Sequence, residues 1–172
     1  MVSVDYRDLL RHMEWADART WSAVLGTPSL HDDLQMRDRL HHFHTTQWAY
    51  LQIWRREPVQ IPQASSFADL KALGQWARAF HRELPSFTDG IDDAMLGRPI
   101  DFPWAKQLEA RFGTVTPATL SESLLQLVLH TAHHRGQVVT KIREAGGDPP
   151  LIDYVAWVWS GRPAPVWERI DT

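Results

Sequence analysis

Apolar side chains recur at three- and four-residue spacings along most of the chain, which is the pattern of helices that bury one face. The first such stretch covers residues 4–25 and stops at Gly26. A second stretch covers residues 32–57, and Asp32 and Gln35 form a weak capping pair at its start. We therefore expect two long amphipathic helices in this part of the chain.

Two contrasting stretches follow. A third amphipathic helix is expected to begin at a cap on Ser65 or Ser66 and to be halted by Pro85, since proline cannot donate the next backbone hydrogen bond of a helix. Residues 86–118 instead contain repeated glycines and prolines between short apolar runs. This pattern is typical of an irregular connection, into which a small hairpin fits best.

The last part of the chain contains the clearest helix signal. Thr119 and Glu122 form a capping box at the start of a helix over residues 120–145, and a short helix is expected over residues 153–159. Four long amphipathic helices predict an all-α protein, an antiparallel four-helix bundle with a short additional C-terminal helix. At this length, a single domain over residues 1–172 is expected.

Composition and charge narrow the class of protein. The chain has 18 basic and 21 acidic residues, a formal net charge of −3 and no block of like charge, so we expect no nucleic-acid partner and no membrane partner. The N-terminus lacks a long apolar run, which predicts a cytoplasmic location. Because the sequence contains no cysteine, a thiol in any reaction must come from outside the protein.

Nine histidines are the most distinctive chemical feature of the sequence. In the expected helix over residues 120–145, His130 and His134 are one turn apart on one side of the helix, whereas His133 points away from the buried stripe. Two imidazoles at this spacing can close onto one metal ion at about 2.0 to 2.1 Å each. The same spacing also occurs in packed helices without a metal, so a third ligand is needed to favour a metal site.

The second expected helix offers three candidates for that ligand in the string HHFH. His41 faces outward relative to the apolar stripe of this helix, while His42 and His44 both lie on its flanks. Spacing alone therefore leaves His42 and His44 as alternatives.

Three segments of the sequence together resemble the DinB/YfiT-like family of metalloenzymes. They are LLRHMEWADART in the first expected helix, HHFHTTQWAYLQIW in the second and HTAHHRGQVVTKIREAGGDPP in the fourth. The resemblance extends over nearly the whole chain apart from residues 86–118, and the last string is its most specific part. It implies a four-helix bundle that holds a metal.

The resemblance also implies which residues bind that metal. When Gln47 and the Tyr50–Leu51 pair are aligned with the corresponding family positions, the family's metal ligand in this helix falls on His42. His44 stays as the alternative. The implied metal ligands are therefore His42, His130 and His134.

Two kinds of metal-dependent enzyme are implied by the resemblance. The leading hypothesis is the transfer of a low-molecular-weight thiol, such as bacillithiol, mycothiol or glutathione, to an electrophilic small molecule. The alternatives are a hydrolase that uses metal-bound water and a non-catalytic metal-binding stress-response protein. Three imidazoles leave a divalent metal, expected to be zinc or nickel, with the open coordination position of catalytic sites. A homodimer is plausible from the resemblance alone.

Other residues of these motifs carry weaker expectations. His12 is either a residue that contacts the metal ligands without binding the metal or a packed surface residue, and we favour the second. Arg135 and Gln137 are expected to be solvated, to form a salt bridge, or to contact another segment or a ligand. Gly136 lowers helix stability by about 1 kcal/mol relative to alanine, so we expect a neighbouring helix to approach closely there.

Overall fold

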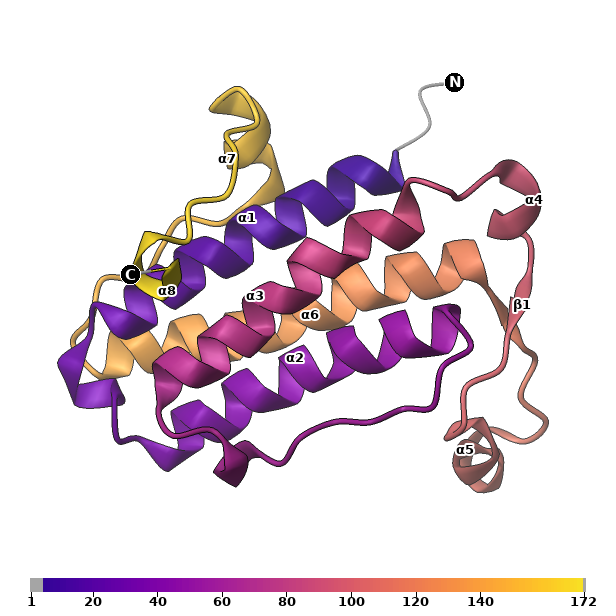
Figure 1. The fold of residues 1–172 in the computed structure, drawn as a ribbon, viewed down its shortest axis with the longest axis horizontal. Coiled ribbons are helices and arrows are strands. Elements are labelled where there is room, and N and C mark those ends of the chain that lie inside the picture. The colour runs from indigo at the N-terminus through magenta and orange to yellow at the C-terminus, as the bar shows by residue number, and fades with distance from the viewer. Residues whose placement is uncertain (1–4, 172) are drawn as a thin grey trace.

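Four long helices lie side by side in the structure, a computed structural model that describes residues 5–171 (Figure 1). They are α1 (Tyr6–Leu25), α2 (Leu34–Trp54), α3 (Leu70–Thr88) and α6 (Leu120–Glu144). The expected all-α bundle is confirmed, because the remaining elements are short and lie at the ends or on the outside of these helices.

The directions of the helices follow from the ends that meet. α2 and α6 are antiparallel, since Trp54 at the end of α2 donates from Nε1 to Ser123 Oγ near the start of α6 at 2.9 Å. α2 and α3 run parallel, because Arg55 just after α2 pairs with Glu83 near the end of α3 at 2.7 Å. This pair departs from a fully antiparallel arrangement because residues 55–69 return along the bundle before α3 begins (Figure 1).

The starts of two helices differ from those expected. α2 is capped by Asp33 rather than Asp32, and α3 is capped by Asp69 rather than Ser65 or Ser66. Both aspartates have extended backbone, and each side chain accepts a hydrogen bond from the backbone N–H three residues on, which satisfies a donor that the first turn leaves free. The two serines lie instead in a short 3₁₀ turn.

The ends of the same helices also differ. α2 ends at Trp54 rather than Glu57, because Arg56 has a left-handed φ of 61° that the helix cannot continue through. α3 passes Pro85 and ends at Thr88, which is buried. A proline so close to the end of a helix removes only one hydrogen bond, so burial of the last turn keeps it helical.

The irregular connection contains more structure than expected. The predicted hairpin is present as β1 (Pro99–Ile100) paired antiparallel with β2 (Ala118–Thr119). Two short helices that the sequence pattern did not predict, α4 (Asp93–Leu96) and α5 (Ala105–Phe112), lie before and between the strands. α5 projects from the end of the bundle (Figure 1). It buries no residue, which explains the absence of a clear apolar stripe in the sequence.

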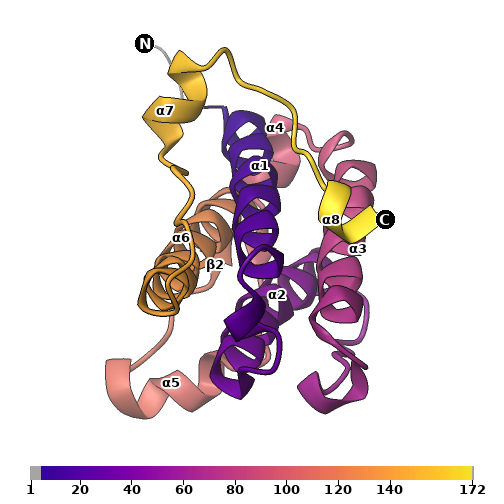
Figure 2. The ribbon, with the colours of Figure 1, turned by 90° about the vertical axis from the view of Figure 1, so that its left-hand side faces the viewer.

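The capping box of Thr119 and Glu122 is confirmed at the start of α6. Beyond α6 the chain forms α7 (Tyr154–Trp159), which was expected, and α8 (Glu168–Asp171), which was not. α7 lies on the outside of α1, and α8 packs against both α1 and α3 (Figure 2). Among the helices of residues 5–171, none combines the length and the apolar character that crossing a membrane requires.

A small apolar cluster of Trp15, Ala16 and Trp157 joins α1 to α7, and the rest of the apolar core falls into two clusters along the bundle. One contains Trp21 and Phe43, and the other contains Met13 and Leu51. Between the two, the four long helices all contribute buried polar side chains at the same level, namely Asp17, His44, Gln47, His81 and Arg135. We call these five residues the polar layer.

Asp17 is the centre of the polar layer and is fully buried. Its Oδ1 accepts a hydrogen bond from Arg135 Nη1 at 2.7 Å, and its Oδ2 accepts from Gln47 Nε2 at 2.7 Å and from His81 Nε2 at 3.0 Å. These partners come from α6, α2 and α3, while Asp17 belongs to α1. One carboxylate therefore ties the four long helices together.

The surroundings of Asp17 keep it ionised. Burial alone would raise the pKa of this carboxyl, but the hydrogen bond from His81 and the positive charge of Arg135 outweigh burial and hold its pKa far below the ordinary value. A charge inside a protein is tolerated only when it is paired and hydrogen-bonded, as Asp17 is.

Asp17→Asn should therefore destabilise the protein by about 3 to 5 kcal/mol near neutral pH, because it leaves the Arg135 charge buried without a counter-charge. The wild-type carboxyl has its lower pKa in the folded state, so it contributes stability above about pH 4 and loses that contribution as the pH falls below this value. The difference between the two proteins should shrink accordingly. Urea denaturation between pH 7 and pH 3 measures both effects.

Asp8→Asn is the matched control on the same helix, since Asp8 pairs with Arg11 and Arg162 near the surface. We expect it to cost less than about 1 kcal/mol. Equal losses in the two variants would contradict the central role of Asp17.

Candidate metal centre

Three histidines from two neighbouring helices come together on one side of the bundle. His42 belongs to α2, and His130 and His134 lie on successive turns of α6. One ring nitrogen from each lies within 4.8 Å of the others. The ring centroids of His42 and His134 are 4.5 Å apart, and those of His130 and His134 are 4.3 Å apart. The three residues that the family resemblance selected thus form one cluster, which we call the histidine cluster.

The histidine cluster is open to solvent on the α2 side, and its surroundings favour the neutral form of His42 and His130. His42 is exposed, whereas His130 and His134 are half-buried. Burial lowers the pKa of His42, and burial together with the neighbouring His134 lowers the pKa of His130 to about 4. A neutral imidazole has a free nitrogen lone pair, which is the form that binds a metal.

Gln137 orients one ring of the cluster. His134 donates from Nδ1 to Gln137 Oε1 at 3.1 Å, and the amide of Gln137 in turn donates to His133 Nε2 at 3.2 Å. This arrangement places a proton of His134 on Nδ1, so Nε2 is the nitrogen that can bind a metal. Hydrogen bonding of the second ring nitrogen is the usual support of a metal-binding histidine. The sequence pattern did not indicate this role, although the three-residue spacing of His134 and Gln137 permits it.

Thr46 is a polar neighbour of the cluster that the sequence analysis also missed. Its hydroxyl lies 3.2 Å from His130 Nε2. Thr46 is one turn after His42 and therefore lies on the same flank of α2. The hydroxyl can hydrogen-bond a molecule that reaches the cluster.

His44, the alternative ligand, lies in the core rather than in the cluster. Its ring is fully buried, it accepts from Trp21 Nε1 on Nε2 at 2.8 Å, and it donates from Nδ1 to Gln47 Oε1 at 2.7 Å. Both ring nitrogens are thus occupied. Burial lowers the pKa of His44 to about 4, in agreement with a neutral ring in this hydrogen-bonded chain.

The remaining histidines of the motifs also lie outside the cluster. His133 is exposed, as helix phase predicted, and it reaches the cluster through Gln137 and through an edge contact with His134. His12 is buried rather than on the surface, since its Nε2 lies 2.9 Å from the carbonyl oxygen of Ile152 and holds that segment against α1.

Two expectations for the residues after His134 have different outcomes. Arg135 forms a buried salt bridge with Asp17, which was one of the possibilities considered. The expected close approach at Gly136 is wrong, because a Cβ at this position would meet nothing within 4 Å. Close approaches occur instead at Gly74, where a Cβ would collide with Ile170, and at Gly147, where a Cβ would collide with Thr27.

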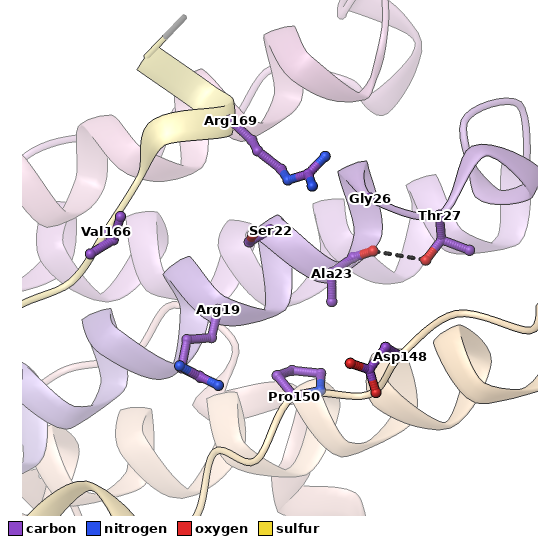
Figure 3. Close-up of a pocket in the computed structure, with 9 residues that line it drawn as sticks. All are labelled: Arg19, Ser22, Ala23, Gly26, Thr27, Asp148, Pro150, Val166 and Arg169. Atoms are coloured by element: carbon purple, nitrogen blue, oxygen red, sulfur yellow. Dashed lines mark hydrogen bonds between the residues drawn. The ribbon is translucent and has the colours of Figure 1, made fainter. Parts of the chain in front are cut away.

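A separate hollow lies at the end of α1, between the segment after α6 and the C-terminal tail (Figure 3). Its charged groups, Arg19, Asp148 and Arg169, are all exposed, and Thr27 is satisfied by the carbonyl oxygen of Ala23 at 2.8 Å. No residue of the histidine cluster lines this hollow, so it is not part of the candidate metal centre.

The donor set fits a divalent transition metal. The cluster offers three imidazole nitrogens, and neither aspartate nor glutamate belongs to it within residues 5–171. Imidazole suits zinc, nickel, copper and iron, whereas calcium and magnesium prefer oxygen ligands. Three protein ligands leave at least one coordination position for another molecule.

Comparison with known proteins identifies one family. The model of the DinB family matches residues 1–165, which includes all four long helices and the histidine cluster. No curated protein matches the chain.

Gln137→Leu should weaken zinc binding by about 10- to 100-fold, because His134 loses the acceptor that fixes its ring and its proton. Gln126→Leu is the matched control, since Gln126 is exposed on the same helix one turn before His130. Competition for zinc with a chromogenic chelator measures both affinities. Equal affinities for the two variants would show that Gln137 does not support the cluster.

Proposed function

The chain belongs to the DinB family, and from this premise we propose that it is a metal-dependent enzyme that transfers a low-molecular-weight thiol to an electrophilic small molecule. The observation that carries the proposal is a solvent-reachable cluster of three imidazoles, to which no carboxylate of residues 5–171 belongs. His42, His130 and His134 would hold a divalent metal, and we propose zinc or nickel. When bound, such a metal supplies a positive charge that lowers the pKa of a thiol or water beside it.

The surroundings of the cluster favour a thiol over water. A thiol has a pKa of about 8.5, whereas the pKa of bulk water is about 15.7. Hydrolysis commonly needs a further group that moves protons, and within residues 5–171 no aspartate or glutamate belongs to the cluster. The thiol reaction is less demanding, because the S–H proton passes to solvent, sulfur bonds to the electrophilic carbon and the leaving group departs with its electron pair.

The chain's own residues have separate tasks in this proposal. His42 lies on the exposed side of the cluster, which gives substrates access from solvent. Gln137 fixes the ring of His134, and the hydroxyl of Thr46 can hydrogen-bond a substrate at the cluster. The sequence has no cysteine, so no protein thiol competes with the small one.

Metal-loaded protein should accelerate the reaction of 1-chloro-2,4-dinitrobenzene with at least one of bacillithiol, mycothiol and glutathione, measured as formation of the coloured thioether. In His42→Ala the rate should fall to the uncatalysed background, because the cluster loses one of its three ligands. In His31→Ala, which removes an exposed histidine outside the cluster, the rate should be unchanged.

The other outcomes separate the alternatives. Hydrolysis of 4-nitrophenyl acetate that depends on His42, without consumption of any thiol, would overturn thiol transfer in favour of a hydrolase. A chain that retains its metal and catalyses neither reaction would be a non-catalytic metal-binding protein.

A further inference from the structure

A cavity of about 670 Å³ lies between α1, α6 and the segment at residues 149–154. Figure 2 shows this segment leaving the end of α6 and passing beside α1 to reach α7. Ala132 lines the cavity and is two residues from both His130 and His134. At about 100° per residue it points about 200° away from them around the helix. The cavity and the histidine cluster therefore open on opposite sides of α6.

The walls of the cavity are largely apolar. Leu9 contributes from α1, Val128 and Val139 from α6, and Leu151 and Ile152 from the outer segment. The volume is within the range of about 300 to 1,000 Å³ that small-molecule sites occupy. An apolar body of modest size is the kind of ligand that such walls accommodate.

Gly136 keeps the cavity open. This glycine lies within the long helix α6, where it lowers helix stability relative to alanine. A Cβ here would meet nothing within 4 Å, so no neighbouring helix explains its presence. Gly136 instead lines the cavity, where a larger side chain would occupy space that the cavity now has.

One unpaired arginine gives the cavity a positive charge. The side chain of Arg135 lines the cavity, but it is 4% exposed and its charge is paired with Asp17 through Nη1 at 2.7 Å. Arg143 also lines the cavity, is exposed, and has no ion pair with any residue of the described chain. Asp153 is an exposed acid on the outer segment and faces the same opening. The unpaired charge of Arg143 therefore suits an anion.

The outer wall of the cavity is anchored. His12 on α1 contacts the carbonyl oxygen of Ile152 at 2.9 Å, and its ring packs against Trp157 of α7 at 5.7 Å between centroids. Burial lowers the pKa of His12, so this contact is made by a neutral ring at neutral pH. The segment that covers the cavity is thus held in place before any ligand arrives.

From these features we propose that the cavity binds a small organic monocarboxylate with an apolar body. Arg143 receives the carboxylate, and the body lies between Leu9, Val128 and Leu151 above Gly136. Carboxylate binding by arginine is a charge-assisted interaction that a neutral group of the same shape cannot reproduce. The site is independent of the metal proposal, because it uses none of the cluster residues.

Calorimetric titration of the full chain with 4-phenylbutyrate, and separately with the neutral 4-phenylbutanamide, tests the site. We expect one carboxylate per chain to bind about tenfold or more tightly than the amide. Gly136→Leu should abolish binding by filling the cavity, and its thermal unfolding temperature should not fall, because leucine has the higher helix propensity. Arg143→Gln should weaken carboxylate binding without changing that of the amide.

Thr140→Leu is the matched control, because Thr140 is exposed on α6 one turn after Gly136 and does not line the cavity. It should bind the carboxylate as the wild type does. Absence of binding to the wild type, equal binding of carboxylate and amide, or unchanged binding by Gly136→Leu would each overturn the proposal.

Discussion

The buried carboxylate of Asp17 is the contact on which the arrangement of the bundle depends. A charge in the core is stable only with its partners in place, and the partners of Asp17 come from the three other long helices. The interaction therefore fixes the position of α2 relative to α6 along the axis of the bundle. The histidine cluster is at this same level, since His134 precedes Arg135 in α6 and His42 is five residues before Gln47 in α2. The geometry of the cluster follows from the polar layer.

Adjacent residues of the same motif consequently have opposite environments. His44 is buried with both ring nitrogens occupied, whereas His42, two residues earlier, is exposed with its ring in the cluster. In α6, His134 lies in the cluster while Arg135 points into the bundle and Gly136 lines the opposite cavity. A single turn of α6 thus contributes to a candidate metal centre, to the core and to a second candidate binding site.

The sequence predicted those features that local pattern controls. Periodicity predicted the four long helices, and the capping box at Thr119 was found as expected. Periodicity contains no information on the direction in which the next helix packs, so it could not predict that α3 runs parallel to α2. Helix phase also could not choose between His42 and His44, because both lie on flanks and only tertiary contacts distinguish them. The expectation that a neighbouring helix approaches closely at Gly136 was wrong, because an empty space leaves no local signal in the sequence.

Zinc K-edge X-ray absorption of the chain loaded with one zinc ion tests most directly whether the histidine cluster holds a metal. The account predicts three imidazole nitrogens at about 2.0 to 2.1 Å and at least one further light ligand that is not histidine. In His42→Ala one imidazole should be lost, and in His133→Ala all three should be retained. A shell without three imidazoles in the wild type, or an unchanged shell in His42→Ala, would contradict the assignment of the metal centre to His42, His130 and His134.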